Sequence, residues 1–322
     1  MRTLVLSGFC VALVACAPTE SVVDSSASDA GVTEQNDAAL SELVDAPTAP
    51  PDAVRPDAGP VRMDPILPTV RGPCDDFSAT GTVTLAGEGG TTREANIWVS
   101  EAAETLDGPL VFYWHGTGGQ PSEATTALGV ARDEILAAGG IVVALSHDPA
   151  AGTFPWFLTT GGTNEADLDF ADEALACAIQ EIGIDTHRIH AIGFSAGALN
   201  VSQMVFRRAS YLASAVTYSG GIIGMRAPAS DAPDARSAVM ALHGGENDRV
   251  VVAFKQTTID FVNALRRGDH FGFICDHGMR HTIPSAARPF AWQFLQAHPY
   301  GMFPAAYASG LPEGFYAPCT LD

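Results

Sequence analysis

The chain has 322 residues, of which 47% are hydrophobic and 17% are charged, and this suits one large globular domain with an extension better than two compact domains. A formal net charge of -20 and a single lysine, Lys255, exclude the clustered cationic side chains that phosphate groups require. We therefore expect neither nucleic acid nor an anionic lipid surface among the partners of this protein.

The first 16 residues have the pattern of an export signal. Arg2 precedes an apolar run over residues 4–14, which is too short to span a bilayer as a helix. The ending Leu13-Val14-Ala15-Cys16 resembles the lipobox of bacterial lipoproteins, which implies a signal peptide over residues 1–15 and lipidation of Cys16. We expect an exported lipoprotein of the bacterial cell envelope, at the outer membrane or cell surface, bound to the membrane through its lipid anchor only. The alternative is an ordinary secretory signal and a secreted protein.

Residues 16–73 are predicted to form a disordered tether. After Cys16 the segment is rich in Ala, Asp, Pro and Ser, and it has no aromatic residue and no sustained hydrophobic period. Such a segment cannot bury enough apolar surface to offset the entropy of ordering it. We expect the catalytic domain over residues 74–322, and the alternative for the tether is a structured subdomain.

The number of cysteines permits two disulfides. If Cys16 is lipidated, an even number remains in the mature chain, as is usual for exported proteins: Cys74, Cys177, Cys275 and Cys319. The spacing does not define the pairing. We favour Cys74–Cys319, since these residues lie near the two ends of the domain and chain termini are often close together. Cys177 lies in a helical pattern, and the alternative for it is a buried thiol.

Strands and helices alternate along the predicted domain, after a Gly-rich hairpin over residues 80–99. A mostly parallel sheet covered by helices on both faces is predicted from this alternation, with ligands bound outside the carboxyl ends of the strands. The predicted strands lie over residues 80–86, 93–99, 109–114, 141–145, 188–192, 213–218, 238–242 and 271–275, and the predicted helices over residues 122–137, 165–182, 198–205, 252–267 and 286–297.

The stretch Gly193-Phe194-Ser195-Ala196-Gly197 joins a predicted strand to a predicted helix. A tight turn between these elements holds its central side chain clear of the backbone and leaves room only for small flanking residues. The pattern therefore indicates that Ser195 is a nucleophile next to a helix N-terminus, whose free amides stabilise an oxyanion.

A second stretch, His115-Gly116-Thr117-Gly118-Gly119, ends a central strand. Its glycines allow the backbone amide of Thr117 or Gly118 to join that of Ala196 in an oxyanion hole. The alternatives are a plain Gly-rich turn or a phosphate loop, and a phosphate loop would require Lys followed by Ser or Thr, where Gln120-Pro121 stands.

We expect the acid and the base of a Ser-His-Asp triad in later loops, in the chain order Ser, Asp, His. Asp248, in the loop after the strand over residues 238–242, is favoured as the acid over its neighbour Glu246. His281, in the loop after the last strand, is favoured as the base over His277, because it lies further from the strand end and just ahead of the closing helix.

These motifs resemble the α/β-hydrolase superfamily. The stretches over residues 185–197 and 275–284 are similar to those of secreted esterases in the polyhydroxybutyrate depolymerase and feruloyl esterase group. The resemblance implies a serine esterase with no metal and no organic cofactor. Two positions depart from the family pattern: Ala198 stands where another Gly is frequent, and Arg280 stands where a Gly usually precedes the base.

We therefore expect a monomeric serine esterase that acts on carboxylic esters of the feruloyl, acetyl-polysaccharide or polyhydroxyalkanoate type. The segment over residues 221–237 is too short for a large lid domain, so the site is expected to be open. Trp156 and Phe157 are predicted to contact the substrate by stacking, and the alternative for them is a place in the core. The alternative functions are an exopeptidase of the same fold and a tethered binding module without turnover.

Overall fold

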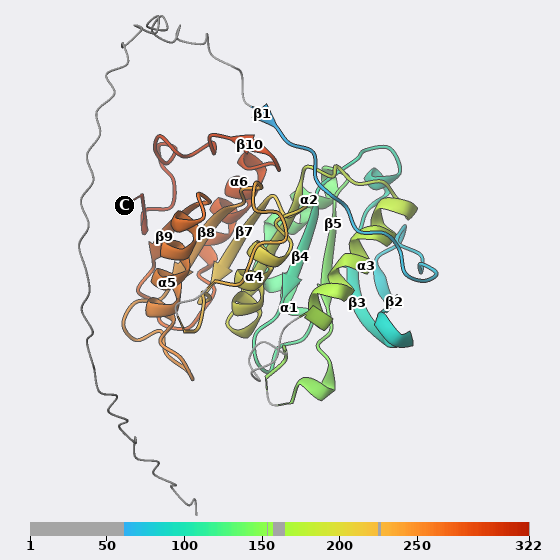
Figure 1. Ribbon diagram of the computed structural model, residues 1–322, viewed down its shortest axis with the longest axis horizontal. Helices are drawn as coiled ribbons and strands as arrows, with labels where there is room; N and C mark the ends of the chain where they lie inside the picture. Colours follow the sequence, from blue (N-terminus) through green and yellow to red (C-terminus); the bar gives the residue numbers. More distant parts are fainter. Residues whose placement is uncertain (1–60, 153, 157–164, 225–226, 322) are drawn as a thin grey trace, which may run out of the picture. The chain divides into compact units, whose positions relative to one another are not determined.

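The computed structural model describes residues 61–152, 154–156, 165–224 and 227–321 (Figure 1). Its strands are β1 (Val61–Arg62), β2 (Gly81–Ala86), β3 (Thr92–Trp98), β4 (Leu110–Trp114), β5 (Ile141–Leu145), β6 (Ile189–Phe194), β7 (Ser214–Tyr218), β8 (Ala238–His243), β9 (Phe271–Asp276), β10 (Met302–Phe303) and β11 (Cys319–Thr320). Its α-helices are α1 (Glu123–Leu128), α2 (Val130–Ala137), α3 (Glu165–Glu181), α4 (Ala196–Arg207), α5 (Phe254–Arg267) and α6 (Arg288–Ala297).

The described residues form a nine-stranded sheet in the order β11-β9-β8-β7-β6-β4-β5-β3-β2. Neighbouring strands from β5 to β9 in this order run parallel, whereas β2, β3 and β11 pair antiparallel at the two edges. β2 and β3 form the predicted hairpin. The predicted mostly parallel sheet is confirmed.

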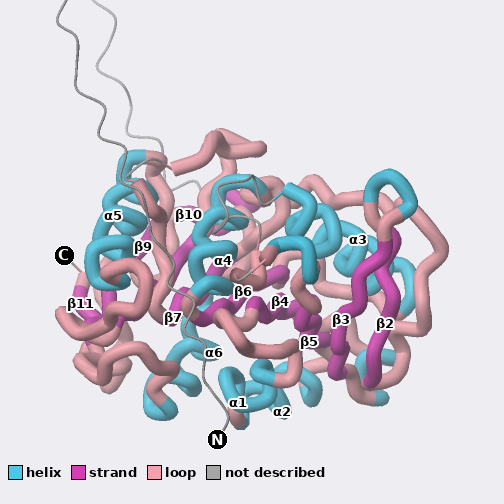
Figure 2. Tube along the Cα trace, turned by 90° about the horizontal axis from the view of Figure 1, so that it is seen from below, coloured by secondary structure: helices cyan, strands magenta, loops and turns pink. Residues whose placement is uncertain are grey.

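Alternate residues of the central strand β4 separate the core into two layers. Leu110, Phe112 and Trp114 pack with residues of α3, α4 and α5. Val111 and Tyr113 face the other way and pack with residues of α1, α2 and α6. Figure 2 shows these two sets of helices on opposite sides of the sheet. The continuous apolar run is thus explained by burial on both faces, as expected for a central parallel strand.

The predicted helix over residues 122–137 is interrupted. Gly129 has φ 57 and ψ -132, outside the helical range, and it separates α1 from α2. A positive φ is readily adopted only by glycine, so the sequence position of the break is set by that residue.

No helix in the described residues is long and apolar enough to cross a bilayer.

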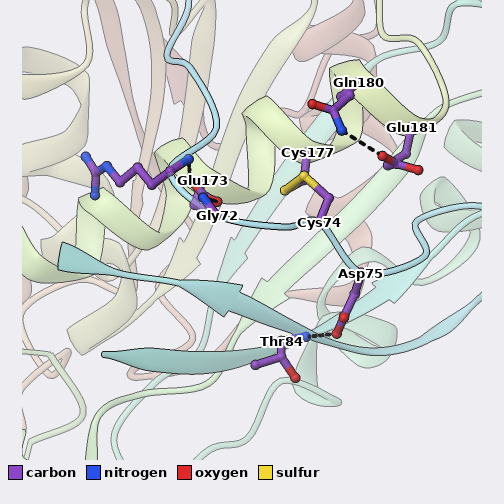
Figure 3. The surroundings of a disulfide bond; sticks show 9 residues. Gly72, Cys74, Asp75, Thr84, Glu173, Cys177, Gln180 and Glu181 are labelled. Atoms are coloured by element: carbon purple, nitrogen blue, oxygen red, sulfur yellow. Dashed lines mark hydrogen bonds between the residues drawn. A yellow bond between two sulfur atoms is a disulfide. The ribbon is translucent and has the colours of Figure 1, made fainter. Parts of the chain in front are cut away.

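The folded unit begins N-terminal to the predicted boundary at Cys74. β1 pairs antiparallel with β10, and the amide of Ile66 donates a hydrogen bond of 2.8 Å to the carbonyl of Ser210. The amides of Arg71 and Gly72 donate to the carboxylate of Glu173 on α3, over 2.8 and 3.1 Å (Figure 3). Residues 61–73 are thus held by backbone hydrogen bonds and not by a periodic pattern of apolar side chains. This explains why their composition predicted a tether.

The predicted Cys74–Cys319 disulfide is wrong. In the described residues Cys74 is bonded to Cys177 on α3 (Figure 3), and Cys275 is bonded to Cys319. The C-terminal strand β11 pairs with β9 in a register that places Cys319 directly opposite Cys275. Cys177 is therefore not a free thiol, and the number of disulfides that the sequence permitted is present.

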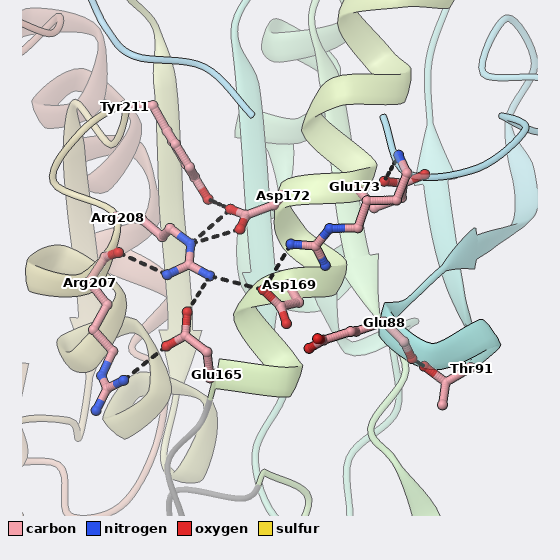
Figure 4. A network of polar contacts seen from close by, with 10 residues as sticks. Glu88, Thr91, Glu165, Asp169, Asp172, Glu173, Arg207, Arg208 and Tyr211 are labelled. Carbon is pink, nitrogen blue, oxygen red and sulfur yellow. Dashed lines mark hydrogen bonds and ion pairs between the residues drawn. The ribbon is translucent and has the colours of Figure 1, made fainter. Parts of the chain in front are cut away.

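A network of charged side chains ties α3 to the end of α4 (Figure 4). The guanidinium of Arg208 lies 2.8 Å from both Asp172 and Glu165, and the hydroxyl of Tyr211 donates to Asp172 over 2.8 Å. Burial raises the pKa of Asp172 although Arg208 and Tyr211 donate to its carboxylate. Because α4 begins directly after Ser195, this network holds in place the helix that follows the predicted nucleophile.

Candidate active site

Ser195 lies in the tight turn between β6 and α4, and its backbone is strained, with φ 55 and ψ -120. The positions two residues before and two residues after Ser195 have room only for glycine. A Cβ atom on Gly197 would lie 2.0 Å from the carbonyl oxygen of Trp114, and one on Gly193 would lie 2.6 Å from the backbone of Gly197. The strain is concentrated at the residue whose hydroxyl faces the cavity, as in other strand–turn–helix nucleophile turns.

The structure brings Ser195, His281 and Asp248 together from three loops at the carboxyl edge of the sheet. Nε2 of His281 lies 2.9 Å from Oγ of Ser195, and Nδ1 of His281 lies 2.7 Å from Oδ1 of Asp248. In the neutral imidazole that donates its Nδ1 proton to the carboxylate, Nε2 is the acceptor for the serine hydroxyl. This geometry can transfer a proton from Ser195 to His281.

The two residues that competed for these positions lie elsewhere. The side chain of Glu246 is 82% exposed and pairs with Lys255 at the surface. His277 is buried, its Nδ1 accepts a hydrogen bond from the amide of Met279, and burial lowers its pKa. The structure thus places His281 next to Ser195 and Asp248 next to His281, and it places neither alternative there.

The second oxygen of Asp248 is held by two further donors. Oδ2 accepts hydrogen bonds from the hydroxyl of Ser219, over 2.7 Å, and from the amide of Gly244, over 2.8 Å. Burial tends to raise the pKa of Asp248, but the hydrogen bonds from His281, Gly244 and Ser219 outweigh it, so the pKa lies below its ordinary value. Ser219 was not predicted from the sequence; its only local signal is its place directly after β7, where it adopts φ 54.

Thr117 and Ala196 both line the cavity beside Ser195, whereas Gly118 is not among the lining residues of the described chain. Ala196 is the first residue of α4, so its amide lies in the turn of the helix that has no intrahelical acceptor. Gly118 adopts φ 77, a conformation that glycine permits in this turn.

The loop that carries Thr117 is anchored by Glu123 of α1. Oε1 of Glu123 accepts hydrogen bonds from the amide of Gly116, over 3.1 Å, and from the hydroxyl of Tyr113, over 2.6 Å. Burial and the nearby Glu123 carboxylate raise the pKa of Tyr113 well above its ordinary value, so its hydroxyl remains a donor. The carbonyl of Gly116 accepts from Nδ1 of His115 over 2.8 Å, and burial lowers the pKa of this histidine. The sequence analysis missed Glu123.

A cavity of about 640 Å³ opens above Ser195. Its lining is predominantly apolar, and Ile223, Val250 and Val251 on its rim are more than half exposed. The lining residues are Thr117, Phe154, Phe194, Ser195, Ala196, Leu199, Gln203, Gly221, Ile223, Val250, Val251, Val252, Phe254 and His281. The cavity is large enough for a small-molecule ligand or for one segment of a polymer.

The predicted substrate contact of Trp156 is wrong. Its side chain is 0% exposed, its ring packs edge-on against Trp114 with centroids 4.9 Å apart, and its indole nitrogen donates to the carbonyl of His115 over 3.0 Å. Trp156 therefore supports the oxyanion loop from the core. Phe154 of the same loop does line the cavity, and Phe157 lies outside the described residues.

Neither a metal nor a cofactor is needed for the proton transfer that this geometry permits. Among the described residues, no group of three or more His, Cys, Asp or Glu side chains is arranged to hold a metal ion. The hydrogen bond between Ser195 and His281 makes nucleophilic attack by the serine hydroxyl possible at this site.

No protein-family model matches the chain. Over 231 residues it is 28% identical to a protein of Nocardia uniformis subsp. tsuyamanensis named "Putative esterase NocK", a match that covers 66% of this chain and 64% of that protein. The chain thus spans less than two thirds of the length of this relative.

Solved structures show the fold. The complex of a pOPH variant with pNPB has a TM-score of 0.62 at 15% identity, covering 78% of this chain and 96% of that chain. Native sOPH has a TM-score of 0.56 at 14% identity, covering 79% and 97%. A thermostable esterase has a TM-score of 0.54 at 17% identity, covering 68% and 63%. With its strand order and its turn at Ser195, the chain has the α/β-hydrolase fold.

Proposed function

We propose that this protein is a serine esterase that hydrolyses carboxylic esters. The observation that carries the proposal is the hydrogen-bonded series Ser195, His281, Asp248 at the base of an apolar cavity. The similarity to a protein named as an esterase supports it. Such a series is the arrangement that activates a serine hydroxyl for acyl transfer.

In the proposed reaction His281 takes the proton of Ser195 as Oγ attacks the ester carbonyl. The oxygen of the tetrahedral intermediate faces the amides of Ala196 and Thr117, which stabilise its negative charge. The intermediate collapses, and His281 gives the proton to the departing alcohol. Water then attacks the acyl-enzyme with His281 as the base, which releases the acid and restores Ser195. Asp248 keeps the imidazole in the required tautomer throughout.

The lining of the cavity favours esters with an apolar acyl group. Among the described lining residues His281 is the only ionisable side chain, and the polar remainder is Thr117, Ser195 and Gln203. An exopeptidase must hold a charged chain end, and the lining residues that the structure describes include no acidic or basic side chain other than His281 to pair with one. Feruloyl esters, acetylated polysaccharides and polyhydroxyalkanoates remain the candidate substrate types from the family resemblance.

A substrate panel tests the proposal. Wild type and Ser195→Ala are compared on p-nitrophenyl butyrate, a feruloyl ester, an acetylated sugar, a hydroxybutyrate oligomer and an aminoacyl p-nitroanilide. We expect turnover of at least one ester by wild type, none above background by Ser195→Ala, and no release from the anilide. Turnover of the anilide alone would favour the exopeptidase, and turnover of nothing by a folded protein would favour the binding module.

We further propose that the protein is held at the cell envelope by lipid on Cys16, which lies outside the described residues. The support is the sequence Leu13-Val14-Ala15-Cys16 alone. Lipid chains add about 0.8 kcal/mol of membrane affinity for each buried methylene, more than this acidic surface could supply. We expect wild type in the membrane fraction with a modified N-terminus. We expect the Cys16→Ser variant to carry no lipid. An unmodified, freely soluble wild type would contradict the proposal.

A further inference from the structure

The imidazole of His281 lies against two phenyl rings. The ring of Phe194 is tilted by 33° to the imidazole, with centroids 4.8 Å apart, and the ring of Phe254 is stacked at 25°, with centroids 4.7 Å apart. The imidazole of the proposed mechanism is therefore in contact with two aromatic rings.

Both rings are fixed by the backbone of the triad. Phe194 is the last residue of β6 and directly precedes Ser195. Phe254 is the first residue of α5, is 3% exposed, and its amide donates a hydrogen bond of 2.9 Å to the carbonyl of Asp248. The backbone of Phe194 is therefore continuous with the nucleophile, and that of Phe254 is hydrogen-bonded to the acid.

Aromatic faces carry partial negative charge, and a cation placed over such a face is attracted to it. In the ground state the imidazole is neutral. In the transition state it gains the proton of Ser195 and becomes a cation that is hydrogen-bonded to Asp248 and in contact with both phenyl rings. An attraction that grows as the reaction proceeds lowers the barrier instead of only tightening binding.

We propose that Phe194 and Phe254 are positioning residues that stabilise the protonated form of His281 through their ring faces, in addition to the charge of Asp248. The inference rests on the proposed esterase function. It assigns a role to the residue before the nucleophile and to the start of α5, neither of which takes part in the bond changes.

Phe254 is the residue at which this can be tested, because substitution at Phe194 would also disturb the nucleophile turn. Phenylalanine analogues with one, two and five fluorine atoms, introduced at position 254 by site-specific incorporation, keep the shape of the ring while they withdraw electron density from its face. We expect kcat to fall stepwise to about tenfold below wild type with five fluorines, in proportion to the lost attraction. KM should stay within about twofold, since the neutral ground state gains little from the face charge.

The matched control is Phe290, which stacks on Tyr316 with centroids 5.7 Å apart and does not line the cavity. The same analogues at position 290 should leave kcat unchanged. Phe254→Leu and Phe254→Tyr give an independent pair: Leu fills the space without a π face and should lose about tenfold in kcat, whereas Tyr should retain most of it. Thermal unfolding verifies that each variant is folded.

A kcat that does not change along the fluorine series, or a Leu variant as active as the Tyr variant, would overturn the inference while ester turnover by wild type continued. Absence of turnover and of Ser195 reactivity in wild type would instead overturn the proposed function. The two failures are therefore distinguishable.

Discussion

The hydroxyl of Ser219 donates a hydrogen bond of 2.7 Å to Oδ2 of Asp248, the carboxylate oxygen that does not face His281. Asp248 is thus held at both oxygens, and its orientation is set by the loop after β7 as well as by its own loop. A carboxylate fixed in this way holds the imidazole in one tautomer and one plane.

Ser219→Ala should therefore lower kcat without removing any group of the triad. Loss of one hydrogen bond to a charged group corresponds to about 1.5 kcal/mol, or roughly tenfold in rate if it is lost in the transition state. Steady-state kinetics on the best ester of the panel measure the effect. Ser78→Ala, at an exposed serine beside Asp76, is the control. Equal kcat values for both variants would show that Ser219 does not orient Asp248.

Replacement of the acid and the base should be far more costly than replacement of their neighbours. We expect Asp248→Asn to lose about 10⁴-fold in kcat, because the amide favours the wrong tautomer of His281, and His281→Ala to lose about 10⁶-fold. Glu246→Gln and His277→Ala should remain near wild type, since neither side chain contacts the triad histidine. An inactive His277→Ala with an active His281→Ala would reverse the assignment of the base.

Removal of the anchor of the oxyanion loop should affect catalysis more than substrate binding. Glu123→Ala leaves the amide of Gly116 and the hydroxyl of Tyr113 without their acceptor. Displacement of one oxyanion donor costs about 10²-fold in kcat at most, and KM should change little. Glu123→Gln keeps an acceptor oxygen and should retain most activity, and Glu134→Ala on the exposed side of α2 is the control. A Glu123→Ala variant that is only less heat-stable would contradict the anchoring role.

Three buried histidines should make the fold sensitive to acid. Burial lowers the pKa of His190 to about 3 and that of His270 and His298 to about 4, below the ordinary value of 6.5. The unfolded chain therefore binds their protons at higher pH than the folded chain does. Their contribution to the free energy of unfolding is complete above about pH 6.5 and falls as the pH drops towards 4, by up to about 1.4 kcal/mol per pH unit for each histidine.

The comparison of wild type with His270→Gln isolates this effect from the pH response of the other charges. Nδ1 of His270 accepts a hydrogen bond of 3.0 Å from the amide of Ser237, which protonation would break. Between pH 6 and pH 5 the variant should lose about 1.2 kcal/mol less stability than wild type in urea unfolding. Parallel stability curves for the two proteins would refute the prediction.

Local rules were sufficient to predict most of the fold. The continuous apolar run over residues 110–114 predicted a strand buried on both faces, and the glycines around Ser195 predicted the nucleophile turn, because sterics act within a few residues of the chain. The chain order Ser, Asp, His located the loops of Asp248 and His281, which the structure brings together.

The remainder depends on contacts between distant parts of the chain. The pairing of Cys275 with Cys319 is set by β11, a two-residue strand with no period to detect. Trp156 is an aromatic residue in a loop, as substrate contacts often are, but it is buried beneath the loop that carries Thr117. Ser219 lies 29 residues before Asp248, and nothing in its immediate sequence indicates the carboxylate to which it donates.

Labelling with a fluorophosphonate tests the central claim most directly, because this reagent reacts with a serine only when a base and an oxyanion site activate it. Wild type should be modified at Ser195, as located by mass spectrometry of the labelled peptide, with loss of all ester turnover. Ser195→Ala, expected to be folded and about 10⁶-fold less active, should not be labelled. A folded wild-type protein that is not modified at Ser195 would contradict the account.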